Sequence, residues 1–196
     1  MKKTNRNSVM ILIFSCILFS GCRSNQKPVV QAAAEPTREQ LIKRGEYLVT
    51  TMGCNDCHSP KQMSPQGPVV IADLMLSGYP ADRPLKKINK DVLKEGWLLA
   101  AGDMTTMAGP WGVSFAANLT SDQTGIGNWT EENFKNAVKE GWYKGLEGTR
   151  KLLPPMPWAN FAPVSDEDIV ALFTYLMSTK PVSNSVPEAL GPDEIK

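Results

Sequence analysis

One short segment holds two of the four cysteines and the only histidine of the chain, because residues 54–58 read CNDCH. Two thiols three positions apart on a tight turn can reach the two vinyl groups of one haem, and the imidazole of the next residue then lies under the iron. The spacing therefore predicts one haem c, bound covalently through two thioethers to Cys54 and Cys57, with His58 as an axial ligand of the iron.

A thioredoxin-like redox pair and a zinc site are the alternatives for this motif. A redox CxxC is expected after a strand in a βαβ pattern, whereas the residues before Cys54 have a helical pattern. Zinc would need at least one more cysteine or histidine, and the remaining thiols, Cys16 and Cys22, lie in the N-terminal segment. The helical pattern before Cys54 and the lack of a further zinc ligand near the motif both favour haem.

The sixth ligand of the iron cannot be a second histidine, so methionine is the next candidate. Met156 lies in the segment 152–158 (LLPPMPW), where prolines fix an extended path and hold the side chain on a stiff loop. We therefore expect Met156 to ligate the iron. Two alternatives stay open: a five-coordinate iron with Met156 packed under the proline turn, and ligation by Met104 or Met107.

Three helices are predicted around these residues, each beginning with a threonine or serine cap. They start at Thr37, Thr130 and Ser165 and end near Met52, Gly141 and Lys180. No clear run of alternating strand residues occurs, although residues 69–76 could form a short extended segment. The fold is therefore expected to be mainly α, with three or more helices and long loops wrapped around one haem.

The N-terminal residues resemble a bacterial lipoprotein signal. Lys2, Lys3 and Arg6 precede an apolar run at 9–18 that is too short to span a bilayer, and small residues lead to Cys22. This pattern predicts a signal peptide at 1–21 and acylation of Cys22. A tether at 22–36, a haem-binding domain at 37–182 and a C-terminal tail at 183–196 would follow. A plain secretory signal and an uncleaved anchor are the alternatives.

The charge balance excludes one class of partner. The 196 residues carry 21 Lys and Arg against 20 Asp and Glu, which leaves no basic footprint for nucleic acid. A hydrophobic content of 42% is also too high for a disordered chain. Removal of the signal would take the formal net charge from +1 to −2.

Three segments resemble the signatures of class I-type cytochromes c, in the order of that family. They are RGEYL at 44–48 before CNDCH, MPW at 156–158, and SDEDIVALFTYL at 165–176. In that family the first and last helices cross where a glycine permits close approach, and Gly45 and Tyr175 are the matching positions. The resemblance implies a cytochrome c fold.

Two further segments, NLTSD at 118–122 and TGIGNWT at 124–130, resemble the cytochrome c subunits of bacterial membrane-bound dehydrogenases. Those subunits usually carry two or three haem domains, whereas this chain has one CxxCH. The resemblance implies a single-electron carrier rather than an enzyme, with redox protein partners such as a dehydrogenase donor or a terminal oxidase acceptor. We expect it on the periplasmic side of the inner or outer membrane, held by its lipid. A haem enzyme or gas-binding sensor with five-coordinate iron is the alternative.

Overall fold

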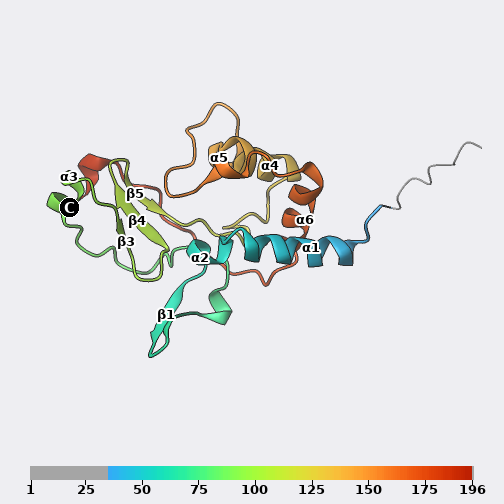
Figure 1. Ribbon diagram of the computed structural model, residues 1–196, viewed down its shortest axis with the longest axis horizontal. Helices are drawn as coiled ribbons and strands as arrows, with labels where there is room; N and C mark the ends of the chain where they lie inside the picture. Colours follow the sequence, from blue (N-terminus) through green and yellow to red (C-terminus); the bar gives the residue numbers. More distant parts are fainter. Residues whose placement is uncertain (1–34, 196) are drawn as a thin grey trace, which may run out of the picture. The chain divides into compact units, whose positions relative to one another are not determined.

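The three helices with predicted caps form at the predicted positions. The computed structural model describes residues 35–195 (Figure 1). The Thr37 hydroxyl accepts the Gln40 amide, and the Gln40 side chain accepts the Thr37 amide, so α1 (Arg38–Thr51) begins with a complete capping box. Thr130 caps α4 (Glu131–Glu140) in the same way, and Ser165 caps α6 (Asp166–Leu176). All three predicted helix starts are confirmed, and α6 ends at Leu176, four residues before the predicted end near Lys180.

Shorter helical elements fill the loops between these three helices. The α-helices are α2 (Cys54–His58), α3 (Lys90–Lys94) and α5 (Trp158–Phe161), and 3-10 turns occur at Ala72–Leu74, Tyr143–Gly145 and Pro192–Glu194. Helices account for 36% of the structure. The prediction of a mainly α fold is therefore not confirmed as stated.

Five short strands account for part of the difference between the predicted mainly α fold and the observed structure. The strands β1 (Lys61–Ser64) and β2 (Gly67–Val70) form an antiparallel hairpin that projects from the rest of the domain (Figure 1). The strands β3 (Leu99–Ala100), β4 (Thr106–Gly109) and β5 (Gly112–Phe115) form a second antiparallel sheet. A strand of two to four residues is too short to display a two-residue period, so these strands have no recognisable signal in the sequence.

The main core forms where α1 crosses α6 (Figure 1). A Cβ atom on Gly45 would lie 2.5 Å from the Cβ atom of Tyr175 and closer still to the carbonyl oxygen of Ala171, so only glycine permits this approach. Beside the crossing, Arg44 donates two hydrogen bonds to the Asp168 carboxylate, at 2.8 and 3.0 Å. The implied close approach at Gly45 and Tyr175 is confirmed.

The C-terminal residues pack on the second sheet. Val113 of β5 and Leu190 exchange backbone hydrogen bonds of 2.8 and 3.0 Å, and Ile195 is buried against Val113 and Ala108. The segment that the sequence sets apart as a tail therefore lies against the domain from residue 183 to residue 195. It completes a small second core.

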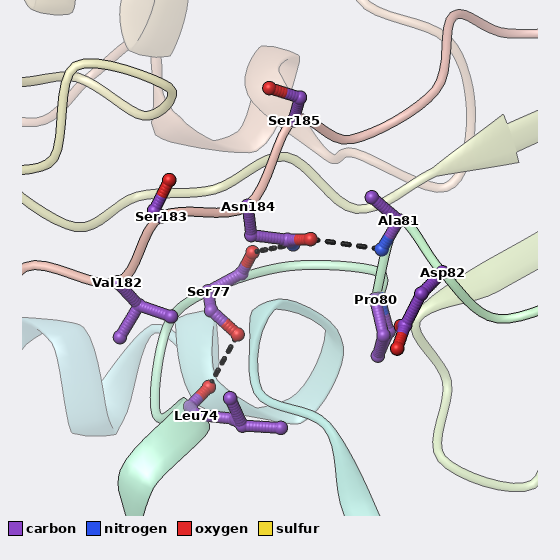
Figure 2. A pocket seen from close by; sticks show the side chains of 9 residues that line it. All are labelled: Leu74, Ser77, Pro80, Ala81, Asp82, Val182, Ser183, Asn184 and Ser185. Atoms are coloured by element: carbon purple, nitrogen blue, oxygen red, sulfur yellow. Dashed lines mark hydrogen bonds between the residues drawn. The ribbon is translucent and has the colours of Figure 1, made fainter.

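Asn184 fixes the beginning of this C-terminal segment. Its side-chain amide donates to the carbonyl oxygens of Ser77 and Tyr79, at 2.6 and 2.9 Å, and its oxygen accepts the Ala81 amide at 2.9 Å. Figure 2 shows Asn184, Ser77 and Ala81 at the edge of a cleft of about 360 Å³ between residues 74–82 and 182–185. The cleft has one ionisable side chain in its lining, Asp82, and none of the predicted site residues.

The predicted signal peptide at 1–21, the acylated Cys22 and nearly all of the predicted tether lie outside the described residues. Within residues 35–195, no helix has the length and apolar character needed to cross a membrane.

Candidate haem site

Both cysteines of the CNDCH segment lie on one turn of α2. Gly53, in the left-handed conformation with φ of 72°, separates α1 from α2 and lets the chain change direction before Cys54. Residues three apart lie on the same side of a helix, so Cys54 and Cys57 share one face. Both thiols are free and partly buried. The turn thus presents two unpaired thiols side by side.

The surroundings of both thiols disfavour the thiolate form. Burial raises the pKa of the Cys54 thiol to about 11. Burial also raises the pKa of the Cys57 thiol, with a smaller contribution from the Asp56 carboxylate that the nearby Lys61 charge opposes. A thioredoxin-type cysteine needs a lowered pKa to form its thiolate at neutral pH. The structure therefore argues against that alternative, as does the helix that precedes the motif.

His58 is fixed in one tautomer by the backbone. Its Nδ1 atom lies 2.7 Å from the carbonyl oxygen of Ala117, and a carbonyl can only accept, so Nδ1 carries the proton. Burial lowers the pKa of His58, against the raising effect of this hydrogen bond, and so favours the neutral ring. The unprotonated Nε2 is then available to a metal, as in metal sites where the second ring nitrogen is held by a carbonyl.

The backbone around His58 is held by a second segment. The His58 carbonyl accepts the Gly78 amide at 2.8 Å. The buried Ser59 hydroxyl accepts the Leu76 amide and donates to the Asn55 side chain, both at 2.9 Å. These bonds fix the C-terminal end of α2 relative to residues 76–78, so the orientation of the imidazole does not depend on one contact.

The seven methionines in the described residues fall into three groups by burial and packing. Met52 and Met177 pack against the main core, and Met63, Met75 and Met104 have exposed side chains. Met107 and Met156 remain, and both are partly buried. The alternatives of Met104 and Met107 both stay open beside Met156, because an exposed side chain can be covered when haem binds.

Strand β5 and the residues after it link the two candidate ligand segments. Ser114 donates to the carbonyl oxygen of Pro154 at 2.6 Å, two residues before Met156. Three residues further along, the Ala117 carbonyl accepts from His58. Met107 pairs with Ser114 across the sheet, so its side chain is on the same face as Ser114. One continuous stretch of backbone thus contacts the predicted proximal ligand and the loop of the predicted distal ligand.

Sequence reasoning missed Ser114 and Ala117. A backbone carbonyl such as that of Ala117 carries no side-chain signal, and Ser114 lies 40 residues from its partner. Within residues 35–195, no group of three or more histidine, cysteine or acidic side chains is placed to hold a metal ion by itself.

Comparison with known proteins identifies relatives of the chain. It is 29% identical over 171 residues to the gluconate 2-dehydrogenase cytochrome c subunit of Pantoea cypripedii, an alignment that covers 87% of this chain and 28% of the relative. It is 31% identical over 165 residues to the alcohol dehydrogenase (quinone) cytochrome c subunit of Gluconobacter oxydans, covering 82% of this chain and 27% of the relative. Its homologues are cytochrome c subunits of dehydrogenases.

The fructose dehydrogenase cytochrome subunit of Gluconobacter japonicus is a further cytochrome relative, 27% identical over 174 residues, with 88% of this chain and 28% of the relative covered. The chain thus spans less than a third of the length of these cytochrome relatives. No protein-family model matches it. Homology to cytochrome c subunits implies a cytochrome c fold and haem c as the cofactor.

The residues of the site fit such a cofactor. Two free thiols share one face of α2, and the imidazole that follows them has its Nδ1 proton engaged and its Nε2 atom unprotonated. These are the groups that a covalently attached haem needs from the protein.

Proposed function

We propose that this chain is a monohaem cytochrome c that transfers single electrons between redox proteins. Cys54 and Cys57 would hold the haem through thioethers, and His58 and Met156 would ligate its iron. The observation that carries the proposal is the arrangement on α2, where two free thiols on one turn precede an imidazole fixed by the Ala117 carbonyl. When bound, the haem supplies one-electron exchange between ferric and ferrous iron.

The chain's own residues bind and orient the cofactor. The hydrogen bond from His58 to Ala117 holds the proton on Nδ1 and increases the basicity of Nε2, while burial of the imidazole favours the neutral ring. The bond from Ser114 to Pro154 restrains the loop that carries Met156. A thioether ligand favours the ferrous state and so raises the reduction potential. With two protein ligands on the iron, no position stays open for a substrate, which is the property of a carrier rather than an enzyme.

We further propose the partners and location from the relatives and the N-terminal sequence. The relatives are named as subunits of dehydrogenases, which supports a dehydrogenase as electron donor, and a terminal oxidase is the corresponding acceptor. The lipoprotein-type signal supports attachment through Cys22 to the periplasmic side of a membrane. Replacement of Cys22 by alanine should release the protein from the membrane fraction.

The ligand assignment is tested by absorption spectroscopy and carbon monoxide binding. The oxidised protein should be low-spin with a sulfur-to-iron charge-transfer band, and the reduced protein should bind carbon monoxide slowly or not at all. Met156→Ala should lose the band and bind carbon monoxide readily. Met107→Ala is the matched control, because Met107 is the other partly buried methionine outside the main core.

Three results would change the proposal. Loss of the band in Met107→Ala alone would transfer the sixth-ligand role to Met107. A wild-type protein that is high-spin and avid for carbon monoxide would favour the five-coordinate enzyme or sensor. Absence of covalently attached haem after denaturation would refute the haem proposal altogether.

A further inference from the structure

The side chain of Lys61 lies at the end of the cysteine-bearing helix, and its hydrogen bonds all go to backbone carbonyls. Four carbonyl oxygens lie within hydrogen-bond distance of its ammonium: those of Asp56 at 2.7 Å, Ser59 at 3.0 Å, Asp103 at 3.1 Å and Asn55 at 3.3 Å. The Lys61 side chain is partly buried. Three of the four acceptors belong to the segment 55–59, which contains most of α2.

These contacts act as a cap on α2. The last carbonyls of a helix lack partners within the helix, and a helix of five residues has few internal hydrogen bonds to begin with. The Lys61 ammonium satisfies carbonyls in that turn and neutralises the negative end of its dipole. Through the Asp103 carbonyl it also connects the turn to the loop before β4.

The charge of Lys61 has no acidic partner in the described part of the chain. Within residues 35–195, no carboxylate forms an ion pair with it. The nearby Asp103 carboxylate is paired with Arg83 at 2.6 Å. A positive charge that is partly withdrawn from water and not paired acts over a longer distance than an exposed one.

We propose that Lys61 is a positioning residue with two effects on a haem bound to this helix. Its hydrogen bonds stabilise the turn that carries Cys54, Cys57 and His58, and its positive charge raises the reduction potential of the iron. One electron added to ferric iron lowers the positive charge of the site by one, and a fixed cation nearby favours that reduced state. The inference rests on the proposed function, because it requires haem on α2.

The test compares midpoint potentials of haem-loaded variants, measured by spectroelectrochemical titration. Lys61→Gln keeps two N–H donors for the carbonyls but removes the charge, and Lys61→Met removes both. Lys61→Arg keeps the charge. Lys87→Gln removes an exposed lysine of the segment before α3 and serves as the control. The Gln and Met variants should have lower potentials than the wild type, while the Arg and Lys87 variants should stay close to it.

Each outcome decides the question. An unchanged potential in Lys61→Gln, or an equal fall in Lys61→Arg, would overturn this inference alone. If neither neutral variant retains haem and Lys61→Arg does, the charge is required for the turn itself, which supports the proposal. If the Arg variant also fails to retain haem, the role of the charge is refuted. A wild type without attached haem would overturn the proposed function as well, so the two failures are distinguishable.

Discussion

Replacement of Gly45 by alanine tests the helix crossing that defines the main core. In an exposed helix, Gly→Ala stabilises by about 1 kcal/mol. Here the added methyl would lie 2.5 Å from the Tyr175 Cβ atom and would overlap the Ala171 carbonyl, so the two helices must separate. Overpacking of this kind costs roughly 1–3 kcal/mol, and contact with backbone on the facing helix places it at the upper end. The expected net loss of stability is about 2 kcal/mol.

Thermal unfolding of the haem-loaded protein, followed by circular dichroism, measures this loss. For a domain of this size, about 2 kcal/mol corresponds to a fall in Tm of roughly 4–8 °C. Gly102→Ala is the control, because a Cβ atom there would meet nothing within 4 Å and its φ is not positive. The control should be neutral or slightly stabilised. A Gly45→Ala protein at least as stable as the wild type would refute the close approach of α1 and α6.

Three further predictions concern the ion pair, the loop before the methionine and the C-terminus. The Arg44 guanidinium holds the pKa of Asp168 below its usual 3.8, so the ion pair stabilises the fold above that pH and the effect is lost as pH falls through the lowered pKa. Asp168→Asn should thus have a lower urea midpoint than the wild type at neutral pH, and the difference should vanish in acid. Ser114→Ala removes a hydrogen bond worth about 1 kcal/mol, so the sulfur-to-iron band should disappear at a lower temperature; an unchanged temperature would separate Ser114 from the ligand loop. Ile195→Ala should cost about 2 kcal/mol or more in urea unfolding, because this side chain is buried, and no loss would mean that the C-terminal residues add nothing to the fold.

Local signals in the sequence were enough to predict the helices. The hydroxyl of Thr37, Thr130 or Ser165 bonds a backbone amide three residues away, so the information for each helix start is contained in four residues. The cysteine spacing is local in the same sense, because one turn of helix sets it. The helix starts and the cysteine-bearing turn are found in the fold as predicted, because the tertiary contacts around them favour the same local conformation.

The parts that the sequence did not predict depend on distant partners. The strands β3, β4 and β5 have two to four residues each, and they exist because the chain returns on itself and is joined by Leu190 from the C-terminal segment. The hydrogen bond between His58 and the Ala117 carbonyl spans 59 positions. Lys61 is one lysine among many in the sequence until its surrounding carbonyls are known. No periodicity or motif encodes such contacts.

The crossing of α1 and α6 joins two segments that are far apart in the sequence. Arg44 and Asp168 are 124 positions apart, and the CNDCH segment follows shortly after the first of them. A chain emerging from its N-terminus therefore exposes both thiols long before the helix that completes the core has arrived. In that interval the cysteines lie on an open chain, accessible to whatever machinery modifies them. The main core is complete only when α6 packs on α1, so Cys54 and Cys57 can be modified before that step without unfolding the domain.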